Sequence, residues 1–466
     1  MKRAIFLLCG ILTLGLVADT DPVTSVTVSQ RWPFSRLVDV TVVLDTVPEP
    51  VDLAFSFSNG SRAYPIPEAA LTGDETLAVT AGTHRYVFDP ALTAVGDVDL
   101  LTRFKLKVEA KAIPLYMIVN LEKDHTGSRL TFLTKDDIRT GAYGAYTEDY
   151  SYLYYQDQHA AHDKFIWTGL TDAAVYAKYA VTNMVFRRLP AGKMMMNWTW
   201  DPGVTFSKPI YASVFEFTRG YARMLGEPFH SFGDGLVSLS KPVFNCRYRE
   251  VRGSAEEGVD WPTTGHEKVA PGSYIGLLRA RVGGGVLFDM PTECEALYAY
   301  AGGSSTFGRF VDGQAYAFEP GAPKSNEVAN AFCRYKYNGG WGPNNDWASS
   351  WNNATDPHVG HAPVGSYLPN GFGLYDVAGN VEEMTLSRNS KGWDSPYRCG
   401  VDPAGPTAAE AQAIGSDGSY VVVGGSSHGG LMTQTDERKI SGDEQSSTAG
   451  FRVFAPVTRA MYDYDL

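Results

Sequence analysis

Residues 369–384, PNGFGLYDVAGNVEEM, decide the fold of this 466-residue chain. Glycine turns bracket a short apolar run, and the four oxygen-bearing side chains of Asp376, Asn380, Glu382 and Glu383 fall within eight residues. Turn formers at this density predict a tight loop rather than a helix or a long strand. The loop can be interpreted as a cation site, as part of an active site, or as a turn whose acids only face water.

Other motifs surround this loop in a fixed order. They are VFRRLPAGKMMM (185–196), KPIYASVFEFTRGYARMLGE (208–227), FDMPTECEALYAYAGG (288–303), and a closing GGS (424–426) followed by GFRVF (450–454). Together with the loop they resemble the formylglycine-generating enzyme or sulfatase-modifying-factor domain, a variant of the C-type-lectin-like fold. The resemblance covers roughly Thr182 to Ala455. It implies an α+β domain rich in loops, but fold alone does not establish function.

Active members of that family use two cysteines, five residues apart, shortly after the GGS. Paired thiolates suit copper(I), which is a soft cation, and oxygen is activated at that centre. In this chain the two positions hold Gly429 and Gln434, and neither can supply a thiolate. His428, beside them, can act as an acid or base near neutral pH, although one histidine does not make a mechanism. We therefore expect the copper oxidase chemistry to be absent.

The resemblance also implies that the loop is a calcium site. Position by position, it assigns oxygen ligands to the Asp376 side chain, the backbone carbonyls of Gly379 and Val381, and the Glu383 carboxylate. Calcium takes six to eight oxygen ligands in a flexible geometry, and a tight turn brings carbonyls and carboxylates together. The chain departs from the family at Glu382 and Met384, where tryptophans are usual. A second family site would begin near Asn330, but an insertion there prevents its placement.

The N-terminal quarter has a different character. Residues 1–18 combine Lys2 and Arg3 with an apolar run that is short for a membrane span, as in a secretory signal peptide. Residues 23–112 then alternate apolar and polar side chains in six or seven short stretches, including one at 75–81. Turn formers separate these stretches, so we expect an immunoglobulin-like β-sandwich. A spacer or adhesion role is the plain expectation for it.

The rest of the chain reads as a connecting Tyr-rich segment at 113–181, the sulfatase-modifying-factor-like domain at 182–456 and a loose acidic tail at 457–466. A strand pair is expected across the Pro-Ala-Gly turn of 185–196. Helical spacing predicts about three turns of helix through Val214, Phe217, Tyr221 and Leu225. Two more helices are expected, in GSYIGLLRARVGG (272–284) and in PTECEALYAYAGG (291–303), where Pro291 and Thr292 mark the start and Gly302 the end.

Removal of the expected signal peptide, which contains Cys9, would leave four cysteines: Cys246, Cys294, Cys333 and Cys399. Export would permit disulfides, but four cysteines allow three pairings, and spacing does not choose among them. Two H-x-x-H pairs, His159 with His162 and His358 with His361, lie in polar loops without a fixed third ligand. We expect exposed histidines there rather than metal sites. Three tryptophans punctuate an Asn- and Gly-rich loop: Trp341, Trp347 and Trp351. Such rings can contact a protein or glycan ligand, or fill the core of a loop-rich domain.

A net charge of −12 argues against nucleic-acid binding, which needs clustered Lys and Arg. No segment after the signal is long and apolar enough to span a membrane. The sequence thus predicts an exported protein, periplasmic, cell-surface or secreted. Its function is expected to be a calcium-stabilised binding or scaffolding module whose partner is a protein or glycan outside the cytoplasm. The alternative is a metal-dependent oxidoreductase of the same family, acting on a sulfatase cysteine or in a related oxidation.

Overall fold

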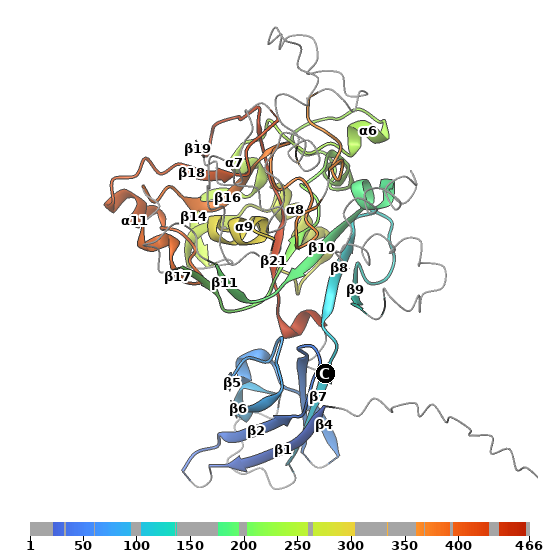
Figure 1. Ribbon diagram of the computed structural model, residues 1–466, viewed down its shortest axis with the longest axis vertical. Helices are drawn as coiled ribbons and strands as arrows, with labels where there is room; N and C mark the ends of the chain where they lie inside the picture. The colour runs from blue at the N-terminus through green and yellow to red at the C-terminus, as the bar shows by residue number, and fades with distance from the viewer. Residues whose placement is uncertain are drawn as a thin grey trace, which may run out of the picture. The chain divides into compact units, whose positions relative to one another are not determined.

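The computed structural model describes residues 22–31, 34–59, 61–94, 104–135, 137, 176–194, 203–259, 264–302, 333, 360–367, 369–391, 395–427 and 438–462. The chain divides into two compact units, one ending at Lys111 and one running from Ala112 to Tyr462 (Figure 1). Strands dominate both units, and helices of the second unit make the whole chain a mixed α+β protein. None of the helices in these ranges is long and apolar enough to cross a membrane.

The first unit consists of two antiparallel sheets that share one core. One sheet has the order β1 (Val23–Gln30), β2 (Val38–Leu44), β6 (Gly82–Phe88) and β5 (Leu71–Gly73), and the other has β4 (Arg62–Pro65), β3 (Asp52–Asn59) and β7 (Phe104–Lys111). Short 3₁₀ turns lie at Glu68–Ala70 and Pro90–Leu92. Alternate residues of the strands bury their apolar side chains in a single cluster that includes Val40, Phe55 and Phe88. The stretch 75–81 expected as a strand forms only an isolated bridge, between Val79 and Val51.

The described residues of the second unit form four sheets. The largest has the strand order β21 (Phe454–Pro456), β13 (Ile210–Ser213), β10 (Asn183–Leu189), β8 (Pro114–Asn120) and β9 (Leu130–Thr134). A second sheet has the order β19 (Arg438–Ile440), β18 (Tyr420–Val423), β16 (Glu382–Arg388) and β20 (Ala449–Gly450), and a third has β11 (Gly192–Met194), β12 (Val204–Phe206) and β17 (Gly400–Val401). The fourth is the pair β14 (Gly253–Val259) and β15 (Thr264–Val269). The closing GFRVF motif therefore joins two sheets, through β20 in one and β21 in the other.

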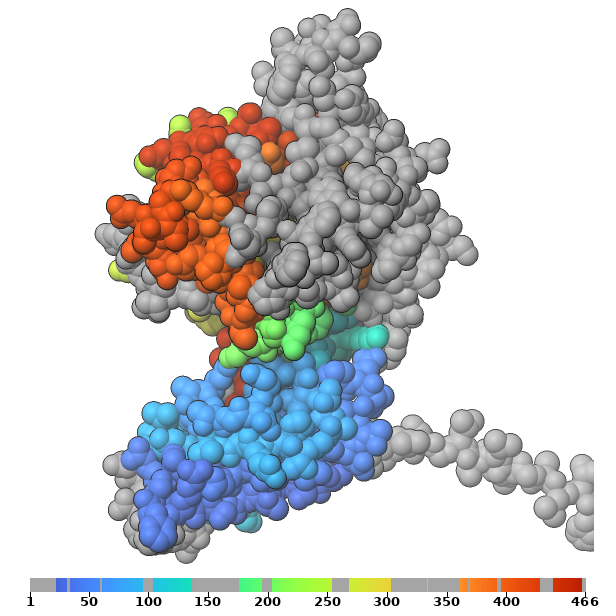
Figure 2. Space-filling model, turned by 60° about the vertical axis from the view of Figure 1, so that its left-hand side comes forward, coloured from blue at the N-terminus to red at the C-terminus, as the bar shows by residue number. Residues whose placement is uncertain are grey.

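Short helices connect these sheets. They are α5 (Arg219–Met224), α6 (Leu236–Leu239), α7 (Tyr248–Val251), α8 (Tyr274–Val282), α9 (Glu293–Tyr300) and α11 (Ala408–Ala413), with a π-helical turn at Lys178–Thr182 and 3₁₀ turns at Pro396–Arg398 and Arg459–Tyr462. Figure 1 shows α9 within the second unit beside β16 and β18, which it contacts. In Figure 2, α11 and its orange neighbours lie at the surface, in agreement with the exposed side chains of that helix.

Both helices expected at 272–284 and 291–303 are present as α8 and α9. The three-turn helix expected through Val214, Phe217, Tyr221 and Leu225 is wrong. Strand β13 ends at Ser213, and only the six residues of α5 are helical. The four apolar side chains are all buried, because the segment is enclosed on every side, so helical spacing was not a reliable signal there.

Two further expectations need correction. The strand pair across the Pro-Ala-Gly turn does not form, since β10 pairs with β8 and β13 while β11 pairs with β12 in another sheet. Within the expected loose tail, residues 457–462 pack into the fold, and Arg459 and Met461 are buried. Strands β8 and β9, in the expected connecting segment, extend the sheet that contains β10. The signal-peptide residues and most of the Tyr-rich segment lie outside the described residues.

The start of α9 yields a prediction for pH dependence. Thr292 caps the helix, and the Glu295 carboxylate accepts bonds from the Thr292 nitrogen at 2.8 Å and its hydroxyl at 2.9 Å. Burial raises the pKa of Glu295 to about 7 from 4.5. The native state therefore binds more protons than the unfolded state between these values, and the free energy of unfolding falls as pH rises through that window.

Glu295→Gln preserves the capping geometry and removes the buried charge. We expect it to raise the free energy of unfolding by about 1–2 kcal/mol at pH 8 and to change it little below pH 4.5. Urea unfolding across this pH range measures the effect. Glu410→Gln is the matched control, because Glu410 makes the same capping contacts to Thr407 on exposed α11 and should show no such pH-dependent gain.

Candidate functional site

Loop 369–384 is fixed to α9 by one asparagine. The Asn370 amide donates to the carbonyls of Ala299 and Tyr300 at 2.8 and 3.2 Å, and its oxygen accepts from the backbone nitrogens of Phe372 and Leu374. A Cβ on Gly371 would lie 2.1 Å from the Gly302 carbonyl oxygen, so only glycine permits this approach. The sequence PNG thus encodes both the bend and its attachment to the helix.

The loop then turns tightly enough to place two non-glycine residues in the left-handed region. Asp376 has φ of 57° and Asn380 has φ of 58°, values that Asp and Asn tolerate better than most residues. Glu382 and Glu383 follow as the first residues of β16. All four polar side chains of the motif, Asp376, Asn380, Glu382 and Glu383, are buried, which excludes the interpretation that the turn's acids only face water.

Three carboxylates lie close together beneath the loop: Glu216, Asp376 and Glu383. Burial raises the pKa of each, most strongly for Glu216, where the charges of Asp376 and Glu383 add to the effect. The pKa of Asp376 rises to about 6. One oxygen of Asp376 accepts from the Gly365 nitrogen at 2.7 Å, and the other is buried without a hydrogen-bond partner. Like charges at this depth disfavour ionisation unless a cation compensates them.

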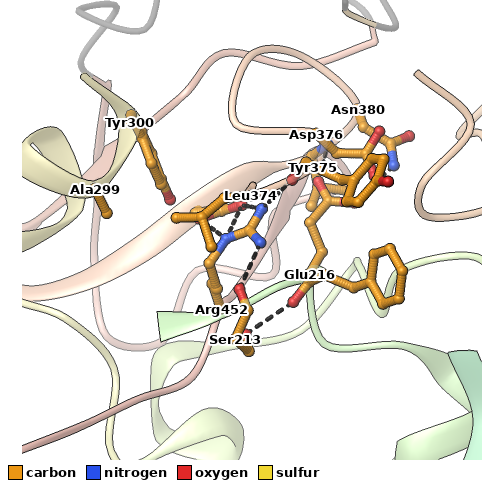
Figure 3. Close-up of polar contacts among 12 residues, drawn as sticks. Ser213, Glu216, Ala299, Tyr300, Leu374, Tyr375, Asp376, Asn380 and Arg452 are labelled. Atoms are coloured by element: carbon orange, nitrogen blue, oxygen red, sulfur yellow. Dashed lines mark hydrogen bonds and ion pairs between the residues drawn. The ribbon is translucent and has the colours of Figure 1, made fainter. Parts of the chain in front are cut away.

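Arg452 of the GFR motif provides one such cation (Figure 3). Its guanidinium is fully buried and binds both oxygens of Glu383 at 2.8–3.2 Å. The remaining donors bond the carbonyls of Ser213, Val214 and Tyr375 at 2.7–3.0 Å. Arg452 therefore connects β13, the loop and β16, and it neutralises one of the three carboxylates.

Asn380 organises the opposite side of the loop. Its amide nitrogen donates to Glu216 at 2.6 Å and to the Ala362 carbonyl at 3.3 Å, while its side-chain oxygen accepts from the Ala362 nitrogen at 2.9 Å. Glu216 also accepts from the Val381 nitrogen at 3.1 Å. The two contacts with Glu216 join segments that are more than 160 residues apart in the chain.

The Asn380 carbonyl oxygen accepts from the Ser427 nitrogen at 2.9 Å and contacts His361 Nδ1 at 2.8 Å. A carbonyl can only accept, so Nδ1 carries the proton in the neutral ring. Ser427 Oγ lies 3.0 Å from the same Nδ1. Since that nitrogen is protonated, it cannot act as a base toward Ser427, and a serine nucleophile of this kind is not assembled. His361 is buried, contrary to the expected exposed loop histidine.

Of the expected calcium ligands, the structure brings Asp376, Gly379, Val381 and Glu383 together in one loop and the start of β16. Glu383, however, directs both oxygens to Arg452. Among the described residues no three His, Cys, Asp or Glu side chains form a group suited to a metal. The expected set contains only two such side chains, with backbone carbonyls as its other ligands.

Cys246, Cys294, Cys333 and Cys399 lie among the described residues, and no disulfide joins any two of them. Burial raises the pKa of Cys246 and of Cys333 to about 12. Cys294 is buried, and its sulfur lies 3.7 Å from the carbonyl oxygen of Arg398. Arg398 immediately precedes Cys399, which is half-buried. The expected sites at His428, Gly429 and Gln434, the tryptophans Trp341, Trp347 and Trp351, and the histidines His159, His162 and His358 lie outside the described residues.

Sequence reasoning missed Glu216, Asn370 and Arg452 as parts of this site. All three stand in motifs that were recognised, FEFTR, PNGFG and GFRVF, but only as markers of the fold. For Glu216 and Arg452 the available signal was a charged residue inside a largely apolar motif, because such a residue is rarely buried unless it is paired.

The chain matches the family described as "Sulfatase-modifying factor enzyme 1-like domain" over residues 172–456. Two curated relatives are each described as "Formylglycine-generating enzyme". The one from Streptomyces coelicolor is 34% identical over 139 residues, 28% of this chain and 36% of the relative. The one from Thermomonospora curvata is 41% identical over 69 residues, 14% of this chain and 22% of the relative. The chain thus spans little more than a third, at most, of these relatives' length.

Solved structures with a similar arrangement include Treponema denticola variable protein 1, with 16% identity and a TM-score of 0.40 over 59% of this chain and 96% of that one. PvdO from Pseudomonas aeruginosa has 20% identity and a TM-score of 0.38 over 59% and 94%. Because the family match covers more than half of the chain, the protein belongs to the family of the sulfatase-modifying factor enzyme 1-like domain.

Proposed function

We propose that this protein is an exported binding or scaffolding module built on the sulfatase-modifying-factor fold, with a calcium-stabilised loop and without the family's copper centre. The observation that carries the proposal is the presence of Gly429 and Gln434 at the two cysteine positions. The high pKa of the buried Cys246 and Cys333 adds support, because copper(I) prefers thiolates and these thiols resist deprotonation.

The finer architecture belongs to this proposal as well. Seven strands in two antiparallel sheets over one core are typical of an immunoglobulin-like sandwich, for which a spacer or adhesion role is the simplest function. The second unit would be a C-type-lectin-like variant that presents loops to a protein or glycan ligand outside the cytoplasm. The tryptophan-rich loop 341–351 and the segment after Ser427 are the proposed contact regions.

Calcium fits part of the loop. Asp376 has a buried oxygen without a partner, and the carboxylates Glu216, Asp376 and Glu383 exceed the compensating charge of Arg452. A bound cation would supply the missing compensation, held by Asp376 and by the backbone carbonyls of Gly379 and Val381. Glu383 fits less well, because a cation near it would be repelled by Arg452.

We expect calcium to raise the melting temperature of the wild-type protein by about 5 °C at a concentration a hundred times its Kd. Asp376→Asn should lose this rise, yet be at least as stable as wild type in chelator, because it removes a buried uncompensated charge. Asp234→Asn is the matched control, since Asp234 is exposed and pairs with Arg223 on the surface. Identical melts of the wild-type protein in calcium and in chelator would refute the calcium component.

The alternative, a metal-dependent oxidoreductase, has one observation in its favour: Cys294 contacts the residue that precedes Cys399. Copper(I) titration with a competing chromogenic chelator separates the two proposals. Stoichiometric copper binding that Cys399→Ser abolishes would favour the oxidoreductase, and oxygen consumption on cysteine-containing peptides would then be measured. Failure to compete with the chelator favours the binding module.

A further inference from the structure

Arg219, at the first position of α5, is a cation held by rings. Its guanidinium carbon lies 5.4 Å from the centroid of Phe232 and 5.1 Å from that of Phe244. Burial lowers the pKa of Arg219 to about 10, with no charged neighbour contributing. Among the described residues no carboxylate pairs with it, and its Nε is buried without a hydrogen-bond partner.

Three other buried arginines of this domain are paired with carboxylates. Arg252 binds Asp289, Arg398 binds Glu293, and Arg452 binds Glu383. Each pair compensates the charge of its guanidinium. At Arg219 two phenyl rings lie near the guanidinium carbon instead, and a ring accepts N–H groups far more weakly than an oxyanion does.

The terminal nitrogens of Arg219 make no hydrogen bond within the part of the chain that the structure describes. Of its three side-chain nitrogens only Nε is fully buried without a partner, and the residue as a whole is half-buried. Both phenylalanines are half-buried as well. A planar guanidinium that has no carboxylate partner among the described residues is suited to bidentate binding of an oxyanion.

The same rings connect Arg219 to the site described above. The Phe244 ring centroid is 4.5 Å from that of His361, and His361 contacts Asn380 and Ser427. Ser427 immediately precedes the segment that we propose as a contact region. Arg219 and His361 therefore contact the same ring, that of Phe244.

We propose that Arg219, with Phe232 and Phe244, forms a subsite that binds an oxyanion group of the ligand, a carboxylate or a phosphate. This inference deepens the proposed binding function and rests on it. The acidic character of the chain favours selectivity, because its net charge of −12 disfavours anions that gain no bidentate contact.

The test uses the full-length mature protein, with acetate and inorganic phosphate as probes and chloride at equal ionic strength as the screening control. Calorimetric titration and thermal melts are run in chelator, which avoids calcium phosphate, and the acetate series is repeated with calcium. We expect millimolar binding of one probe and a matching rise in melting temperature. Preference for acetate or for phosphate identifies the source of the oxyanion.

Arg219→Gln should weaken anion binding at least tenfold without lowering the melting temperature in chloride, since it removes an unpaired buried charge. Arg219→Lys keeps the positive charge but not the planar, bidentate guanidinium, so it should retain weak phosphate binding and lose acetate binding. This variant replaces Arg219→Gln in the test if the glutamine variant fails to fold. Arg62→Gln is the matched control, because Arg62 also lies over a ring, that of Tyr64, in the first unit.

The subsite is refuted if wild type shows no anion-specific effect, or if Arg219→Gln binds either probe as well as wild type. The outcome is separable from that of the calcium experiment. Anion binding without a calcium effect would support the subsite and refute only the calcium component. A calcium effect without anion binding would refute only the subsite.

Discussion

Replacing Arg452 by methionine is expected to lower the free energy of unfolding by about 3–5 kcal/mol, the range for removing one partner of a buried ion pair. The substitution leaves Glu383 buried without its bidentate partner. It also removes the donors to the carbonyls of Ser213, Val214 and Tyr375, and each acceptor left unsatisfied adds to the cost. Urea unfolding of both proteins at pH 7 measures the difference.

Two further variants isolate the cause. Arg249→Met removes an arginine of an exposed pair with Asp443, so it should cost less than about 1 kcal/mol. Adding Glu383→Gln to Arg452→Met should recover part of the loss, because the unpaired carboxylate is then neutral. A loss at Arg452 no larger than that at Arg249 would show that the buried ion pair contributes little to stability.

Local signals explain which parts of the fold could be predicted. Helix α9 follows from Thr292, Glu295 and Gly302, because a capping box and a positive-φ glycine act within a few residues of the chain. The loop at 369–384 follows from its glycines for the same reason. Strands β2 and β3 were confirmed because each buries mainly one face and therefore alternates.

The errors occurred where tertiary contacts override local pattern. Residues 214–218 are all buried, so the spacing of their apolar side chains does not distinguish a helix from irregular backbone. The chain is irregular between the end of β13 and the start of α5. The turn after Leu189 was taken for a hairpin, but each of its strands finds a better partner elsewhere. A single sequence contains no record of such pairings.

The site was predictable only as a loop. Position by position, the resemblance to the family suggested Asp376 and Glu383, but it could not show that Glu383 would bond Arg452, 69 residues later. The link from Asn380 to Glu216 spans 164 residues and is equally invisible. Buried polar groups must find partners, which predicts that such contacts exist without predicting where.

Asn380 is the position at which backbone strain and buried hydrogen bonds meet, and substitutions there should separate the two. Its side chain makes three buried contacts, to Glu216 and to both backbone groups of Ala362. Asn380→Ala loses all three and also forces alanine to adopt φ of 58°. We expect a loss of about 3–4 kcal/mol in the free energy of unfolding, combining unsatisfied groups with roughly 1 kcal/mol of strain.

Asn380→Gly removes the same hydrogen bonds but tolerates the backbone angle, so it should be more stable than Asn380→Ala by about 1 kcal/mol. Asn380→Asp keeps the shape of the side chain and the oxygen that accepts from the Ala362 nitrogen, but it replaces the amide group that donates to Glu216 with a carboxylate oxygen. Two facing carboxyls must then share a proton, and this variant should lose stability steeply as pH rises above the range in which one of them stays protonated. Urea unfolding of the three variants from pH 5 to 8 tests the set. Equal stability of the alanine and glycine variants, with no added pH dependence in the aspartate variant, would show that neither backbone strain nor the contact with Glu216 governs this loop.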